Sequence, residues 1–174
     1  MATRHRYRGG YVNIAPTVVF MTIACGLIAD AAAQSDLTKK AVSAGFEVVF
    51  EYGKKFDEEP INVDNAAKEI ETLLKAGAKR IILERSQLDT TLGPKGEFPT
   101  APRMQELVDR IGMAALVFEA ETPAHMVYLL HTFGPDVNLG PNIAAEYVAS
   151  NLEPARCGLG RAEGYSFFER LRKS

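Results

Sequence analysis

Short apolar runs alternate with helical patterns along most of the chain, and this alternation constrains the fold more than any other feature. Five apolar runs of strand length occupy residues 18–23, 46–52, 80–84, 114–119 and 136–139. The segments between them carry polar capping residues, first-turn prolines or a glycine after the last turn, which are helix boundary signals. Alternation of strand and helix predicts a parallel sheet with right-handed crossovers.

The helix boundaries can be predicted from the same signals. The expected helix starts are Ser35, Asp64 or Asn65, Thr100–Pro102 and Thr122–Pro123. The first helix is expected to reach Ala44, with Gly45 just after it. Residues 86–99 contain Gly93-Pro94 and Gly96, and we expect them to form the longest loop.

The spacing of the strands favours a (β/α) barrel of the TIM type. The first four strands begin about 30 to 35 residues apart, and the last gap is shorter. A doubly wound sheet has a similar rhythm, but no G-x-G-x-x-G motif follows any strand, which weakens that alternative. A complete barrel needs about 250 residues. The 174 residues supply about five β/α units, so we expect an α/β chain that forms an incomplete barrel.

Composition limits the function classes. With 47% hydrophobic and 24% charged residues, the chain can form a packed core. The formal net charge of -2 argues against a nucleic-acid-binding protein, which would carry a basic excess. The two cysteines, Cys25 and Cys157, do not form a disulfide framework and fit a cytoplasmic protein. No Cys/His cluster has zinc spacing.

The N-terminal segment allows two interpretations. Arginines precede an apolar run, and Ala31-Ala32-Ala33-Gln34 resembles a cleavage site, which together outline a secretory signal. Pro16 at the start of the run and Asp30 near its end favour a buried strand instead, and the run is too short to span a membrane. We therefore expect a basic tail over residues 1–15 and one domain over residues 16–174. Secretion remains the alternative to a cytoplasmic location.

Polar residues follow the strands at their carboxyl ends. The residues in question are Glu51, Lys54, Lys55, Glu84, Arg85, Glu119 and Asn138. In a parallel barrel all strands end on one face, so these side chains are expected to converge on a single rim. Carboxylates suit a hard cation such as Mg²⁺, whereas lysine and arginine suit an anionic substrate. The pattern indicates a metal-assisted site for a small anion.

Each of these residues also has a purely structural interpretation. Lys54 and Lys55 could lie in a solvated turn, Glu84 and Arg85 could form an ion pair, and Asn138 could bind loop backbone. His125 and His131 lie six residues apart, which does not place both on one helix face, so we expect packed or surface histidines rather than metal ligands. The chain has no G-x-S-x-G motif.

Three blocks of the sequence resemble the phosphosulfolactate synthase family. The blocks are Phe46–Lys55 (F-E-V-V-F-E-Y-G-K-K), Ala76–Ile82 (A-G-A-K-R-I-I), and Val117–Ala120 followed by F-G-P-D-V-N-L over Phe133–Leu139. The resemblance covers roughly residues 16–151 and corresponds to the later strands of the family's barrel. The family's early strands have no counterpart here.

The resemblance implies a Mg²⁺-dependent carbon–sulfur lyase that adds sulfite to phosphoenolpyruvate, as in coenzyme M biosynthesis. It points to Lys54 or Lys55 as the general acid and to Glu51, Glu84 and Glu119 as candidates for binding the metal or metal-bound water. Among these, Glu84 and Glu119 are the expected metal ligands and Glu51 has the more catalytic role. Arg85 would hold the phosphate or sulfite, and Asn138 would bind substrate or metal-bound water.

The sequence departs from the family in places. An acidic S-D-G segment is replaced by Ala24-Cys25-Gly26, and the arginine-rich segment becomes Cys157-Gly158-Leu159-Gly160-Arg161, which lacks the family's aspartate. A truncated or degenerate relative that acts as a binding or stress-associated protein without catalysis is therefore an alternative, as is another phosphoenolpyruvate- or sugar-phosphate-handling barrel enzyme. For the synthase we expect small anionic substrates, phosphoenolpyruvate and sulfite, and no membrane or nucleic-acid contact. We also expect a homo-oligomer, because an open barrel exposes strand edges.

Overall fold

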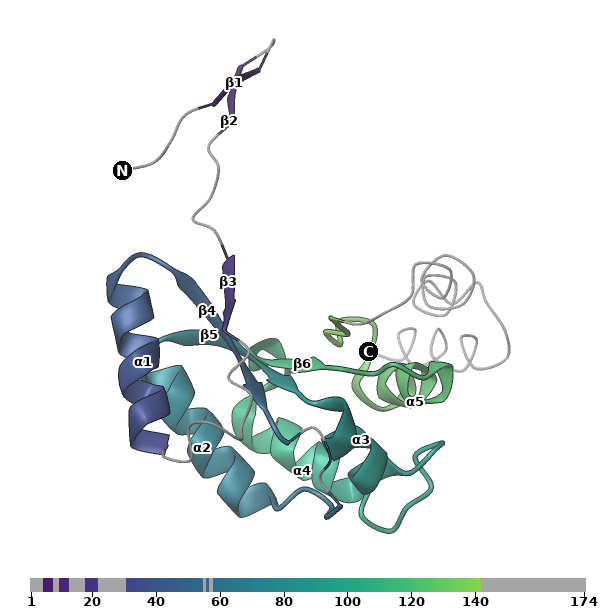
Figure 1. Ribbon diagram of the computed structural model, residues 1–174. Helices are drawn as coiled ribbons and strands as arrows, with labels where there is room; N and C mark the ends of the chain where they lie inside the picture. The colour runs from purple at the N-terminus through teal and green to yellow at the C-terminus, as the bar shows by residue number, and fades with distance from the viewer. Residues whose placement is uncertain are drawn as a thin grey trace.

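The computed structural model describes residues 31–54, 56 and 58–141 with their side chains (Figure 1). It also describes the backbone of residues 5–7, 10–12 and 18–21. Lys55, Cys25 and the segment 157–161, all discussed above, lie outside the described residues.

A parallel sheet forms the centre of the described chain. It consists of β3 (Val18–Met21), β4 (Glu47–Tyr52), β5 (Ala78–Leu83) and β6 (Leu116–Phe118). All three pairings are parallel, and the strand order β3-β4-β5-β6 follows the chain. In a doubly wound sheet the order of the strands reverses at a switch point, so an order that follows the chain supports the barrel interpretation. The described residues form an open sheet rather than a closed barrel.

Helices follow the strands and cover one face of the sheet (Figure 1). They are α1 (Ala31–Ser43), α2 (Val63–Lys75), α3 (Arg85–Leu92), α4 (Pro102–Ile111) and α5 (Pro123–Phe133). A 3₁₀ turn at Met113–Ala115 leads into β6. In this part of the chain no helix has the length and apolar character that crossing a membrane would require.

The core lies between the sheet and this helical layer. Alternate residues of β4 and β5, such as Val48, Phe50 and Leu83, point into it and are almost fully buried. They meet apolar residues of α2 and α4, including Ile70 and Leu107. Because strand side chains alternate between faces, the intervening residues point to the other side of the sheet. In a complete barrel that side lines the interior.

The structure corrects several predicted boundaries. Ser35 does not cap the first helix but is buried inside α1, because Ala31, Ala32 and Ala33 are good helix formers and extend the helix backwards. The α2 helix is capped by Asn62, whose side chain accepts a hydrogen bond from the backbone N–H of Asn65, rather than by Asp64 or Asn65. The Thr122 cap and the first-turn position of Pro102 are confirmed.

The prediction of a long loop over residues 86–99 is wrong for the first half of that range. Residues 85–92 form α3, and Leu88 and Leu92, four residues apart, are fully buried. The fifth predicted strand is reduced to a single parallel bridge between Phe118 and Leu139. In the segment expected to be a basic tail, β1 (His5–Tyr7) and β2 (Gly10–Val12) pair as an antiparallel hairpin.

Candidate metal centre and its surroundings

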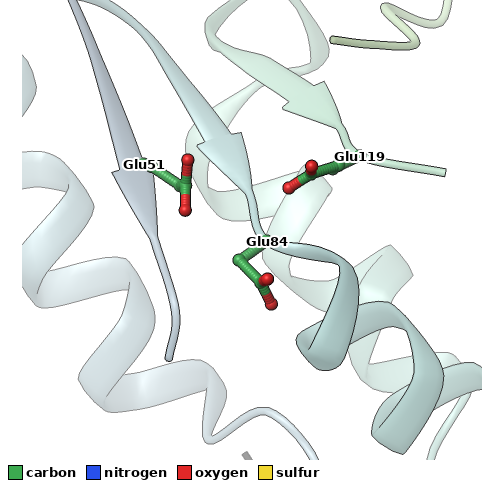
Figure 2. Close-up of side chains that lie close together, drawn as sticks. All are labelled: Glu51, Glu84 and Glu119. Carbon is green, nitrogen blue, oxygen red and sulfur yellow. The ribbon is translucent and has the colours of Figure 1, made fainter. Parts of the chain in front are cut away.

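Three glutamates meet at the carboxyl ends of three neighbouring strands. Glu51 lies near the end of β4, and Glu84 and Glu119 directly follow β5 and β6. Their side chains lie close together, with Glu51 and Glu119 turned toward one another and Glu84 bent toward the start of α3 (Figure 2). The sheet register explains this convergence. Glu51 pairs with Ile82, and Ile82 pairs with Val117; Glu84 and Glu119 each follow two residues later and so lie on the same side. Each strand therefore presents a glutamate on the face opposite the helices.

We call Glu51, Glu84 and Glu119 the glutamate cluster. One carboxylate oxygen from each residue lies within 4.8 Å of the other two. Glu84 and Glu119 are each only 7% exposed, and Glu51 is half-buried. Three negative charges this close repel one another unless protons or a cation offset them. Hard oxygen donors at this spacing suit a divalent cation such as Mg²⁺.

Glu84 is held in place by the start of the helix that follows it. Its Oε2 accepts hydrogen bonds from the backbone N–H of Ser86 at 2.6 Å and from the Ser86 hydroxyl at 2.5 Å. Glu84 thereby caps α3. A carboxylate at this position is favoured by the unpaired N–H groups and the dipole of the helix N-terminus.

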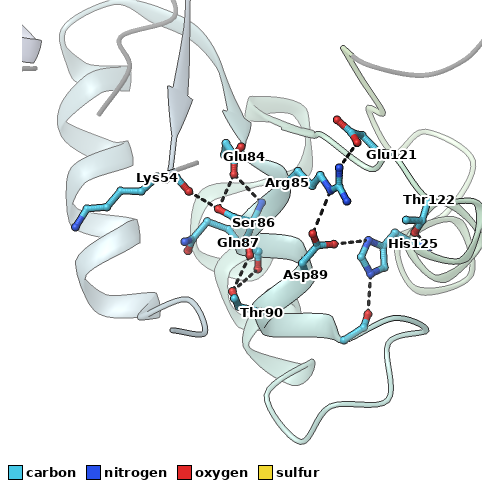
Figure 3. A network of polar contacts seen from close by, with 11 residues as sticks. Lys54, Glu84, Arg85, Ser86, Gln87, Asp89, Thr90, Glu121, Thr122 and His125 are labelled. Carbon is cyan, nitrogen blue, oxygen red and sulfur yellow. Dashed lines mark hydrogen bonds and ion pairs between the residues drawn. The ribbon is translucent and has the colours of Figure 1, made fainter. Parts of the chain in front are cut away.

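Arg85 turns away from the glutamate cluster and forms ion pairs of its own (Figure 3). Its Nε donates to Asp89 at 3.1 Å, and its Nη1 donates to Glu121. The charge and hydrogen bond of Asp89 raise the pKa of the Arg85 guanidinium, and Glu121 raises it further. The side chain is 46% exposed, so solvent screens these pairs and their stabilising effect is small.

His125 extends the same polar network into the protein. It is 1% exposed, and its Nε2 lies 2.7 Å from the backbone oxygen of Gly93. Its Nδ1 faces Asp89 Oδ1 at 3.6 Å. The histidine therefore joins α5 to the end of α3, which agrees with the prediction of a packed histidine.

The remaining predicted site residues are not gathered around the cluster in the described structure. The Lys54 side chain is exposed and extends away from Glu84 (Figure 3). Asn138 uses its amide nitrogen to donate to the backbone oxygen of Leu116 at 3.0 Å and, more weakly, to that of Met113. Leu116 begins β6, so this contact lies at the end of the strand opposite Glu119. Of the predicted residues, the structure brings together Glu51, Glu84 and Glu119.

Sequence reasoning missed Ser86 and Gln87. Both fall at the start of α3, which was expected to be a loop, and Gln87 is 3% exposed. The signal that could have found them is the spacing of Leu88 and Leu92, which is typical of one buried helix face. A helix in this place would have put Ser86 in the first turn beside Glu84.

Comparison with known proteins places these residues in a family context. The family model described as (2R)-phospho-3-sulfolactate synthase (ComA) matches residues 26–161, which include the whole glutamate cluster. A curated protein of Methanothermobacter thermautotrophicus, named phosphosulfolactate synthase, is 33% identical over 127 residues. This match covers 71% of the chain and 48% of the relative, so the chain spans about half the length of that relative.

Proposed function

Since the chain belongs to the phosphosulfolactate synthase family, we propose that it takes part in the addition of sulfite to phosphoenolpyruvate. The observation that carries the proposal is the glutamate cluster at the carboxyl end of the sheet, with its oxygens within 4.8 Å of one another. Catalytic groups of parallel barrels lie at this end of the strands. The small anionic substrates and the carbon–sulfur lyase chemistry come from the family.

The donor set fits Mg²⁺. Carboxylate oxygens are its preferred protein ligands, and Mg²⁺ is usually bound through only one or two carboxylates while it keeps several waters. Glu84 and Glu119 are the proposed ligands, and Glu51 the residue that contacts metal-bound water. The bound ion would supply positive charge that stabilises the negative charge developing on the substrate carboxylate.

The reaction forms one carbon–sulfur bond and adds one proton to the substrate. The sulfur of sulfite forms a bond to the methylene carbon of phosphoenolpyruvate, and the electrons of the carbon–carbon double bond move toward the carboxylate. The neighbouring carbon then takes a proton from a general acid. We propose Lys54 or Lys55 as this acid, because the Gly53-Lys54-Lys55 segment directly follows the strand that carries Glu51.

Arg85 and Asn138 have narrower roles in this proposal. Arg85 can hold a phosphate or sulfite oxygen with N–H groups other than those bonded to Asp89 and Glu121, but these two carboxylates offset its positive charge. The Asn138 amide group holds the chain beside β6 through the Leu116 carbonyl. Both hydrogens of this amide nitrogen face backbone oxygens, that of Leu116 and, more weakly, that of Met113, so substrate binding by it would displace one of them and its geometry favours support of the strand.

Substrate consumption tests the proposal directly. Purified protein is mixed with Mg²⁺, phosphoenolpyruvate and sulfite, and the loss of phosphoenolpyruvate is followed with and without sulfite. We expect sulfite-dependent loss, and we expect Lys55→Ala or Lys54→Ala to abolish it because the carbon then lacks its proton donor. Lys68→Ala, which removes an exposed lysine of α2, is the matched control and should retain the activity.

A wild-type chain that consumes no phosphoenolpyruvate under these conditions would rule out the synthase proposal for this chain. Equal activity in all three lysine variants would instead remove Lys54 and Lys55 from the mechanism while leaving the reaction in place.

A further inference from the structure

The main chain between Gly53 and Lys54 is fixed against the start of α3. The Ser86 hydroxyl donates to the backbone oxygen of Lys54, and the same hydroxyl lies 2.5 Å from Glu84 Oε2 (Figure 3). Two residues earlier in the chain, the backbone oxygen of Tyr52 accepts a hydrogen bond of 2.9 Å from the N–H of Glu84. The end of β4 is thus joined to the β5–α3 junction at two carbonyls, one on each side of Gly53.

Gly53 allows this close approach. Its φ is +120°, which side chains rarely tolerate, and a Cβ at this position would lie 2.8 Å from Gln87 Cγ and 2.9 Å from Glu84 Cβ. Only glycine leaves room for the backbone to pass so near the helix. The segment therefore packs closely against α3, and the hydrogen bond from Ser86 can fix the position of the Lys54 backbone.

The contacts of Ser86 connect two parts of the proposed site. Its backbone N–H and hydroxyl both contact Glu84, which belongs to the glutamate cluster. Its hydroxyl also reaches the carbonyl of Lys54, the residue directly before Lys55. The hydroxyl has a single hydrogen, which the Lys54 carbonyl and Glu84 Oε2 share, while the backbone N–H of Ser86 holds Glu84 independently. The Ser86 side chain thus contacts both segments.

We propose that Ser86 is a positioning residue that fixes the backbone of Gly53 and Lys54 relative to the Glu84 carboxylate. It does not touch the reacting atoms; it acts by holding the backbone of Lys54, one of the two candidate general acids. The catalytic part of this inference rests on the proposed function. The structural part, the ordering of the segment by the Ser86 hydroxyl, stands independently of it.

The test uses Ser86→Ala, which removes the hydroxyl, and Ser86→Thr, which keeps it. Thr90→Val is the matched control, because Thr90 lies one turn further along α3 and its hydroxyl donates to the backbone oxygen of Ser86, away from Lys54. The first readout is the backbone order parameter of Gly53 and Lys54 from ¹⁵N relaxation of the full chain. Rigid backbone gives about 0.85 and flexible backbone less than about 0.6.

We expect order parameters near the rigid value in the wild type, Ser86→Thr and Thr90→Val, and a fall toward the flexible value in Ser86→Ala. The second readout is turnover. Loss of the hydroxyl should lower kcat roughly tenfold, as the loss of about one hydrogen bond predicts, while KM changes little because Ser86 does not bind substrate. Ser86→Thr should restore kcat.

The two readouts separate the two claims. A wild-type chain without turnover defeats the proposed function, and the order parameters still decide whether Ser86 fixes the segment. Unchanged order parameters in Ser86→Ala, or a segment that is already flexible in the wild type, would overturn the inference whatever the activity. A loss of kcat in Thr90→Val equal to that in Ser86→Ala would also overturn it, because general loosening of α3 would then explain the effect.

Discussion

Glu84 has a role at the end of β5, at the start of α3 and in the glutamate cluster. It directly follows β5, it caps α3 through the N–H of Ser86, and its carboxylate lies within 4.8 Å of Glu51 and Glu119. A side chain held by a helix N-terminus has few alternative rotamers. The same bonds that stabilise the start of α3 therefore fix the position of the Glu84 carboxylate beside Glu51 and Glu119.

Gly53 offers a prediction on this residue-scale packing. Gly53→Ala should lower the free energy of unfolding more than Gly45→Ala does, although both glycines have positive φ. The backbone penalty applies at both positions and is about 1 to 2 kcal/mol. At Gly53 the new methyl group also meets Gln87 and Glu84 at less than 3.0 Å, whereas nothing lies within 4 Å at Gly45. Such overpacking costs a further 1 to 3 kcal/mol or so.

Urea unfolding of the two variants measures this difference. Equal destabilisation by the two substitutions would show that α3 moves aside at little cost, and that the β4 end does not pack tightly against it.

At the scale of single elements, capping residues and first-turn prolines predict where a helix starts when burial in the core does not favour another start. The Thr122-Pro123 start of α5 was predictable because a capping threonine and a first-turn proline fix it locally. The start of α2 was predicted two or three residues too late. Asn62 and Asp64 are both good capping residues, and burial of Val63 in the core decides that the helix already includes it.

The glutamate cluster shows the same limit. That Glu51, Glu84 and Glu119 would share one rim followed from their place at strand ends, because parallel strands bring those ends together. The directions of Arg85 and Asn138 did not follow, because they depend on Asp89, Glu121 and the Leu116 carbonyl, which become neighbours only in the folded chain.

The cap of α2 gives an element-scale prediction. Asn62→Ala should reduce the free energy of unfolding by about 1 kcal/mol, within the range known for N-cap deletions. The reason is that the backbone N–H of Asn65, now bonded to the Asn62 side chain at 3.1 Å, loses its partner. Asn65→Ala is the matched control, since alanine is the better helix former and only the backbone of Asn65 takes part in the cap. Thermal unfolding compares the two.

Greater destabilisation by Asn65→Ala than by Asn62→Ala would contradict this assignment and would return the cap to the position first expected from the sequence.

At the scale of the whole molecule, the open sheet leads us to expect self-association. In the described residues β3 pairs with β4 alone, and beyond β6 only the single bridge to Leu139 continues the sheet. Unpaired strand edges and the face opposite the helices favour pairing with another chain. Light scattering should therefore give a mass at least twice the 19.0 kDa of one chain. A monodisperse mass of one chain across a dilution series would count against it.

We propose that the glutamate cluster binds a divalent cation, and calorimetric titration with Mg²⁺ is the decisive experiment. We expect saturable binding by the wild type and an affinity loss of roughly tenfold or more in Glu119→Gln, since ligand charge sets the affinity of such sites. Glu121→Gln, which removes a carboxylate paired with Arg85 outside the cluster, should bind as the wild type does. No saturable binding, or equal affinity in Glu119→Gln and the wild type, would show that the glutamate cluster is not a cation site.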